Sequence, residues 1–213
     1  MNIWILHQFQ ADPEFAVMEV LIIVFSVCCH EYMHARAALW QGDDTAALMG
    51  HLTLNPLKQM GPFSIVLLAV AGIAFGSVPV NPARLRRPYG EAWVAFAGPA
   101  TNLALAAVFV LTCAGVRNFA PPSNGAQFAF SVLFFGALIN MVLFILNMIP
   151  VPPLDGYGIV KVFFPGLGGG NSEFMNGAMF FILIVLFFSA EHLFSAANSI
   201  VRFALEIFGI QFA

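Results

Sequence analysis

Three ionisable residues, His30, Glu31 and His34, stand together in the mainly apolar run VLIIVFSVCCHEYMHARAALW, residues 20–40. On a helix, the His-x-x-x-His spacing places two imidazoles one turn apart on the same face, where both can bind one Zn²⁺. Glu31 can then act as a general base towards water at the metal. The His-Glu-x-x-His motif alone is of moderate specificity. Three such groups in an apolar helix are costly unless they serve a function, which favours a zinc site over an accidental match.

A catalytic zinc usually has three protein ligands, so a third ligand must come from elsewhere in the chain. Asp155, in NMIPVPPLDGYG at residues 147–158, is the main candidate. It follows an apolar segment, on a backbone that three prolines keep out of a helix. An aspartate before glycine is also typical of an ordinary turn. Glu191 and His192 are an alternative source of ligands, whereas Glu19 lies three helical turns before the motif.

The composition places these residues in a membrane. Of the 213 residues, 60% are hydrophobic and only 9% are charged, and the mean hydropathy is +0.87, whereas a typical soluble domain is roughly 25% charged. The net charge of −3 and the lack of long charged runs argue against nucleic acid as a partner. The sequence therefore predicts an all-α polytopic membrane protein, a single domain over residues 1–213, whose partners are the lipid bilayer and other membrane proteins.

The apolar residues group into five segments, at roughly 14–40, 62–77, 91–116, 126–149 and 177–198. Four of them reach the roughly 20 residues that a membrane-spanning helix needs. The second segment is shorter and contains Pro62, Gly72 and Gly76, which fits a re-entrant or interfacial segment. Short β-prone pieces in GDDTAALMGHLTLNPLKQMG and VPVNPARLRRPYG predict small strands near the site. The ending SIVRFALEIFGIQFA predicts a short amphipathic helix.

The positions of the candidate ligands constrain the topology. His30 and His34 lie towards the C-terminal end of the first segment, and Asp155 follows the end of the fourth. The helices formed by the first and fourth segments must therefore run in the same direction. This requires that one segment between them does not cross the membrane, and the short segment 62–77 is the candidate. The site then shares its side with an excess of basic residues, which marks the cytoplasmic side of the cell (inner) membrane. Arg117 and Arg202 fall on the other side, against Arg36, Lys58, Arg84, Arg86, Arg87 and Lys161.

Three motifs in this order, HEYMH, GPATN at residues 98–102 and NMIPVPPLDG, resemble the site-2 protease family of intramembrane zinc metalloproteases. HLTLNPLKQMGP and VPVNPARLRRP are similar to its short members without a PDZ domain, and the resemblance covers about residues 14–165. It implies that His30, His34 and Asp155 bind zinc and that Glu31 is the catalytic acid/base. It also implies that Asn102 and Asn147 are polar residues that bind substrate or lie in the core near the site.

The activity that this resemblance implies is zinc-dependent hydrolysis of peptide bonds within or near the transmembrane helices of membrane-protein substrates, known as regulated intramembrane proteolysis. Tyr157 follows Gly156 where such proteins often have a second glycine, a departure that bears on the local turn and not on the ligand. The alternative is a metal-binding or metal-transporting membrane protein without proteolytic activity. A transporter needs a path of further ionisable residues, for which Glu19, Glu191 and His192 are the candidates.

Overall fold

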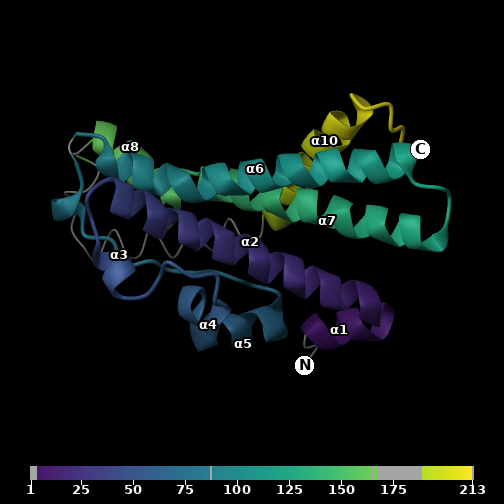
Figure 1. Cartoon of the computed structure of the whole chain (residues 1–213), viewed down its shortest axis with the longest axis horizontal. Helices are drawn as coiled ribbons and strands as arrows, with labels where there is room; N and C mark the ends of the chain where they lie inside the picture. The colour runs from purple at the N-terminus through teal and green to yellow at the C-terminus, as the bar shows by residue number, and fades with distance from the viewer. Residues whose placement is uncertain (1–3, 87, 165, 167–188, 213) are drawn as a thin grey trace.

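The computed structural model describes residues 4–86, 88–164, 166 and 189–212. These residues form helices and connecting segments and contain no strand (Figure 1). Three helices are long and apolar enough to cross a membrane: α2 (Pro13–Trp40), α6 (Gly90–Phe119) and α7 (Asn124–Asn147). At about 1.5 Å per residue, each exceeds the roughly 30 Å of a hydrocarbon core. Three of the four predicted spans thus form helices of membrane-spanning length.

Local sequence signals determine where these helices begin. α2 starts at Pro13 after Asp12, whose side chain accepts a hydrogen bond from the backbone N–H of Phe15 at 3.0 Å. The hydroxyl of Ser123 caps the first turn of α7 in the same way, at 3.1 Å. A short helix, α1 (Trp4–Ala11), precedes α2. Both caps are exposed and lie at the end of the bundle where α2 and α7 begin (Figure 1).

The directions of the long helices follow from their connections. In Figure 1, α2 runs from right to left, α6 returns from left to right, and α7 runs from right to left again. α2 and α7 are therefore parallel, as the positions of the candidate ligands require. The C-terminal ends of both helices lie at the end of the bundle where α8 (Asp155–Phe163) begins.

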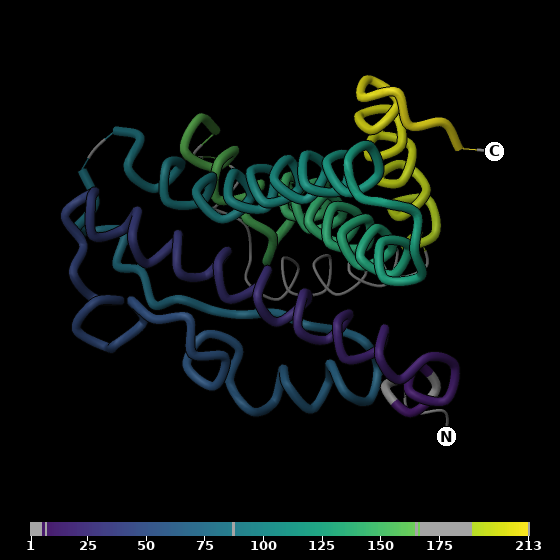
Figure 2. Tube along the Cα trace, turned by 45° about the vertical axis from the view of Figure 1, so that its right-hand side comes forward, coloured from purple at the N-terminus to yellow at the C-terminus, as the bar shows by residue number. Residues whose placement is uncertain are grey.

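The second apolar segment forms a helix that is too short to cross. After α4 (Pro56–Gln59), α5 (Gly61–Ala71) has 11 residues, which rise about 16 Å, half of a hydrocarbon core. It ends at Gly72, whose φ of 71° is in the left-handed region that favours glycine. The chain then returns as an extended segment, residues 73–81, between α2 and α5 (Figure 2). This geometry agrees with the predicted re-entrant segment.

Hydrogen bonds hold the extended segment against α4 and α5. The backbone N–H of Phe75 donates to the hydroxyl of Ser64 at 2.9 Å, and this hydroxyl donates to the carbonyl of Phe75 at 2.6 Å. The N–H of Ser77 donates to the carbonyl of Gln59 at 3.1 Å. Two alternate residues of the segment are thus bonded on the same edge.

The small strands predicted in residues 42–61 and 78–90 do not form in the part of the chain that the structure describes. The first region forms α3 (Thr45–Leu48) and α4, and the second contains the 3₁₀ helix η1 (Pro82–Arg84). The reason is the Asn-Pro pair in each region. The side chains of Asn55 and Asn81 each accept a backbone N–H two residues on, at 3.0 and 3.1 Å, and so start a helical turn.

Asp43 ties the far end of the extended segment to the end of α2. It is fully buried, and its carboxylate accepts hydrogen bonds from the backbone N–H and hydroxyl of Thr45 at 3.0 and 2.5 Å. It also accepts the N–H of Asn81 at 2.6 Å. Burial raises the pKa of a carboxyl group, but these hydrogen bonds outweigh burial and lower the pKa of Asp43. The carboxylate is therefore ionised at neutral pH, and the segment is fixed beside α2.

The amphipathic helix predicted near the C-terminus is present and starts earlier than expected. α10 (Ala190–Glu206) packs Ala197, Val201 and Leu205 against α6 and α7, at the end of the bundle opposite α8 (Figure 1). It takes in the last residues of the apolar segment predicted at 177–198. Residues 177–188 of that predicted span lie outside the described residues.

The topology predicts a labelling pattern. With the three native cysteines replaced by serine, we expect Lys58→Cys and Arg84→Cys to react with a membrane-impermeant thiol reagent from the same side, because α5 lies between them without crossing. Asn124→Cys, at the start of α7, is the control and should react from the other side. Labelling of Lys58→Cys and Arg84→Cys from opposite sides would show that α5 crosses.

Candidate metal centre

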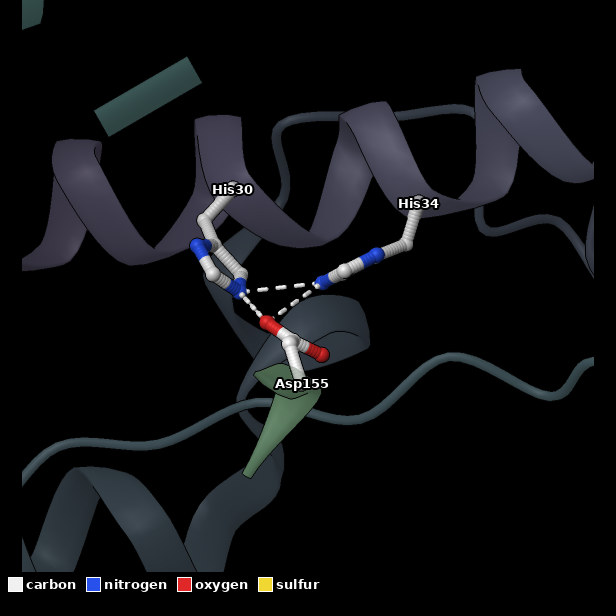
Figure 3. A group of neighbouring side chains, drawn as sticks. All are labelled: His30, His34 and Asp155. Carbon is white, nitrogen blue, oxygen red and sulfur yellow. Dashed lines mark hydrogen bonds and ion pairs between the residues drawn. The ribbon is translucent and has the colours of Figure 1, made fainter. Parts of the chain in front are cut away.

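The structure brings together the three residues predicted as metal ligands. His30 and His34 project from successive turns of α2 towards Asp155, at the start of α8 (Figure 3). The Nε2 atoms of the two histidines are 3.0 Å apart. Oδ2 of Asp155 lies 3.0 Å from Nε2 of His30 and 3.2 Å from Nε2 of His34. Among the described residues, this is the one group of three or more His, Cys, Asp or Glu side chains close enough to share a metal ion.

The hydrogen bonds of the two rings determine which nitrogen faces the centre. Nδ1 of His34 lies 2.7 Å from the carbonyl oxygen of Val94, which can only accept, so Nδ1 carries the proton. Nδ1 of His30 lies 2.5 Å from Oδ1 of Asn102, again an acceptor. In both neutral rings, Nε2 therefore carries a lone pair.

Three electron-pair donors thus converge. Oδ2 of Asp155 is buried and accepts no hydrogen bond, although two imidazole nitrogens lie within 3.2 Å of it. Lone pairs so close together repel each other unless a cation lies among them.

The distances and the donor set fit zinc. Two ligand atoms at the usual zinc distance of about 2.0–2.1 Å lie about 3.3 Å apart across a tetrahedral site. The three distances between Nε2 of His30, Nε2 of His34 and Oδ2 of Asp155, 3.0 to 3.2 Å, are close to this value. Two imidazoles with one carboxylate form a ligand set found at catalytic zinc sites.

Close helix packing positions Asp155. A Cβ atom at Gly156 would lie 2.5 Å from the carbonyl oxygen of Met148, so glycine lets the start of α8 pack on the end of α7. A Cβ at Gly158 would lie 3.0 Å from Cβ of Ala95, so α8 also packs closely on α6. Asp155 is therefore held from two sides.

Two further contacts complete this part of the site. Tyr157, the departure from the usual second glycine, lies in the first turn of α8, and its N–H donates to the carbonyl of Leu154 at 3.1 Å. The helical turn thus accommodates a larger residue. Lys161 of α8 forms an ion pair with Glu91 of α6, which joins these two helices near the mouth of the site.

Gly98 of α6 leaves the space that a metal ion needs. A Cβ atom at this position would collide with Nε2 of His34 and would lie 2.5 Å from Nε2 of His30. Any side chain here would therefore occupy the centre. Asn102 lies one turn later on the same helix and is fully buried. The first and last residues of the GPATN motif thus face the two histidines.

Glu31 lies beside the centre in a cavity of about 690 Å³. Its side chain is buried and packs against Gly76, where a Cβ atom would lie 2.6 Å from Oε1 of Glu31. Asn147 also lines the cavity, and its amide N–H donates to the carbonyl of Leu143 at 3.0 Å. The rest of the lining is mainly apolar and includes Val27, Ala74, Phe75, Val80, Val94 and Leu146.

The alternative ligand candidates lie elsewhere. Glu19 is 11 residues before His30 on α2, about 16 Å along the helix axis, and is buried. Glu191 and His192 are exposed in the first turn of α10, at the opposite end of the bundle. None of the three joins the metal cluster in the described part of the chain.

The sequence analysis missed several residues that shape the site. Gly98 and Gly76 act through the absence of a side chain, and Val94 acts through its carbonyl group. A glycine within an apolar segment is a signal of close approach, so the two glycines could have been found. The backbone carbonyl of Val94 could not be found in this way, because every residue type carries such an acceptor.

Comparison with known proteins identifies the family. The sequence matches the family model of Peptidase family M50 over residues 18–131 and 120–190. Three curated relatives, each named a putative zinc metalloprotease, are similar over much of the chain. YwhC of Bacillus subtilis is 36% identical over 175 residues, which are 79% of this chain and 78% of that protein. MJ0611 of Methanocaldococcus jannaschii is 30% identical over 155 residues, 70% of this chain and 74% of that protein.

The third relative is longer. Rip2 of Mycolicibacterium smegmatis is 35% identical over 144 residues, which are 65% of this chain and 54% of that protein. This chain thus spans about half of Rip2. No solved structure matches the chain.

The chain belongs to Peptidase family M50, the site-2 protease family. It is a zinc metalloprotease and, with its long apolar helices, a multi-pass membrane protein. The resemblance inferred from the three motifs is confirmed.

Gly98 provides a test of the centre that leaves every ligand in place. We expect Gly98→Ala to weaken zinc binding on the order of a hundredfold, because the added methyl group would occupy the space between the two Nε2 atoms. Gly115→Ala is the matched control on α6, since nothing lies within 4 Å of a Cβ there. Chelator competition on both purified variants measures the affinity, and equal affinities would contradict the assigned metal position.

Proposed function

We propose that this protein is a zinc-dependent intramembrane endopeptidase that hydrolyses peptide bonds within or near the transmembrane helices of membrane-protein substrates, in regulated intramembrane proteolysis. His30, His34 and Asp155 hold the zinc ion, and Glu31 is the catalytic acid/base. The observation that supports this proposal best is the convergence of three lone-pair donors beside Glu31, inside a bundle of apolar helices. Membership of Peptidase family M50 supports the same chemistry.

The residues of the chain supply most of the steps. Bound zinc contributes Lewis acidity, which acidifies water and polarises the scissile carbonyl group. Glu31 takes the proton of the attacking water and passes a proton to the leaving amine. Val94 and Asn102 hold the two imidazole rings so that each Nε2 faces the metal. Asn147 lines the same cavity and is positioned to contact the bound peptide.

The extended segment 73–81 provides a place for the substrate backbone. Phe75 and Ser77 are bonded towards α4 and α5. In an extended chain the N–H and C=O groups of successive residues point to opposite edges, so those of Gly76 and Val78 point away from these bonds. Both residues line the cavity beside Glu31. An unwound peptide that pairs with this edge as a strand lies next to the catalytic groups.

Such pairing meets a requirement of the membrane. A peptide bond in a transmembrane helix is shielded by the hydrogen bonds of that helix, and an unwound segment in hydrocarbon needs other partners. The free edge at Gly76 and Val78 supplies these partners, and the mainly apolar lining of the cavity accommodates apolar side chains. The substrate is therefore an apolar segment with low helical stability.

The orientation follows from the basic residues. Arg36 lies near the C-terminal end of α2, Arg84 lies in η1 shortly before α6 begins, and Lys58 and Lys161 belong to α4 and α8; these positions are towards the end of the bundle that carries the centre (Figure 1). Arg117 lies in the last turn of α6, at the other end. By the positive-inside rule, this distribution supports an active site near the cytoplasmic face of the cell (inner) membrane.

A pair of substitutions separates catalysis from metal binding. We expect Glu31→Gln to keep one zinc per chain and to cleave a model transmembrane substrate at least on the order of a hundredfold more slowly, because it removes the general base. Asp155→Ala should lose zinc and activity together, because it removes a ligand. Zinc content and cleavage rate are measured on the same detergent-solubilised samples.

Three outcomes would contradict these assignments. Wild-type turnover by a zinc-loaded Glu31→Gln variant would remove Glu31 from catalysis. Unchanged zinc content in Asp155→Ala would remove Asp155 from the ligand set. If the wild-type protein carries zinc across vesicle membranes and cuts no membrane substrate, it is a transporter.

Strand pairing with the substrate predicts a specific main-chain effect. We expect Val78→Pro, which removes one N–H donor, to lower kcat/KM about fivefold, the equivalent of roughly 1 kcal/mol for one hydrogen bond, with zinc content unchanged. Val78→Ala is the matched control, because it shortens the side chain and keeps the N–H. Equal effects of the two substitutions would show that the side chain matters and the main chain does not.

A further inference from the structure

A chain of buried polar side chains extends from His30 into the apolar part of the bundle. Oδ1 of Asn102 lies 2.5 Å from Nδ1 of His30, and Nδ2 of Asn102 donates to Oδ1 of Asn140 at 3.0 Å. Nδ2 of Asn140 donates to the hydroxyl of Ser26 at 2.8 Å and to the backbone carbonyl of Gly136 at 2.9 Å. The three polar side chains beyond His30 are fully buried. They join α6, α7 and α2.

The direction of this chain is fixed at its far end. The two ends of an asparagine amide are similar in shape, so its partners determine which end is the oxygen. A backbone carbonyl such as that of Gly136 can only accept a hydrogen bond. Asn140 must therefore present Nδ2 to Gly136 and Oδ1 to Asn102. Asn102 in turn must present Nδ2 to Asn140 and Oδ1 to His30.

The last step determines the state of the histidine. An oxygen facing Nδ1 of His30 requires a proton on Nδ1, which leaves the lone pair of the neutral ring on Nε2. If the Asn102 amide were reversed, its NH₂ group would donate to a lone pair on Nδ1, and the proton of the neutral ring would move to Nε2. That tautomer cannot bind a metal through Nε2.

We infer that Asn140 is a positioning residue of the metal centre: by fixing the direction of the Asn102 amide, it reserves Nε2 of His30 for the metal. This inference rests on the proposed role of His30 as a zinc ligand. Asn140 belongs neither to the metal cluster nor to the cavity lining, and its hydrogen bond to Asn102 connects it to His30. Ser26 has a lesser part, because the carbonyl of Gly136 is sufficient to orient Asn140 without it.

Two substitutions of similar shape test this role. Asn140→Leu removes the acceptor for Asn102, so the amide can adopt either direction, and we expect zinc affinity to fall on the order of tenfold, at the lower end of the range for outer-shell partners. Asn140→Asp keeps an oxygen facing Nδ2 of Asn102 in either protonation state, so zinc affinity should remain within about threefold of wild type. Ser26→Ala is the control and should bind zinc as wild type does.

The thermal stability of each variant separates positioning from a general structural role. A buried acid is more costly than a leucine of similar size, so Asn140→Asp should have a lower Tm than Asn140→Leu. A purely structural role would therefore weaken zinc binding more in Asn140→Asp. Positioning predicts the reverse order of affinity. Chelator competition with Zn²⁺ on the full-length protein measures the affinity, and the absorption of bound Co²⁺ reports the coordination.

The outcomes are distinct. Weaker binding in Asn140→Leu with near wild-type binding in Asn140→Asp and Ser26→Ala supports the inference. Wild-type affinity in Asn140→Leu, or affinities that follow Tm across the three variants, would overturn it while leaving the proposed function intact. If the wild-type protein itself binds no zinc, the proposed function fails first, since His30 is then no ligand.

Discussion

The structure depends on one electrostatic constraint: three lone-pair donors meet inside an apolar bundle, and only a cation can hold them there. Nε2 of His30, Nε2 of His34 and Oδ2 of Asp155 lie 3.0 to 3.2 Å apart. To bring them together, α2 and α7 must run in the same direction, so α5 has to turn back at Gly72 and cannot cross. Several close approaches then follow, and glycines permit them, because any side chain at Gly98 would fill the metal position.

The sequence predicted the parts of this arrangement that depend on residue type and spacing. The lengths of the apolar segments were sufficient to anticipate the three long helices. The spacing of the two histidines, and the requirement that their helix and the helix before Asp155 run in the same direction, were sufficient to anticipate that Asp155 meets the histidines. The prediction of strands was wrong because Asn55 and Asn81 cap helical turns before proline. Residue propensities alone indicate the end of a strand at the same residues. The carbonyl of Val94 could not be predicted, since every residue carries one.

The extended segment 73–81 shows how one element can serve the fold and the chemistry together. One edge is bonded to Ser64 and Gln59, and its end is held by the buried carboxylate of Asp43. These bonds keep the backbone extended without a partner strand. Its other edge, at Gly76 and Val78, therefore stays available beside Glu31. In the proposed function, rigidity on one edge allows the opposite edge to receive a flexible substrate.

Polar groups are costly in hydrocarbon, and the arrangement of the site reduces this cost by leaving few of them unpaired. Nδ1 of each histidine is paired, with Val94 or with Asn102, and the amide of Asn102 is paired in turn with Asn140. Because each amide has one donor end and one acceptor end, pairing them in series gives the chain a direction. A backbone carbonyl on α7 can thereby determine the proton position on a ring of α2. In a low-dielectric bundle, where a wrongly directed amide finds no water to compensate, such a chain is a stringent means of presenting a lone pair to a metal.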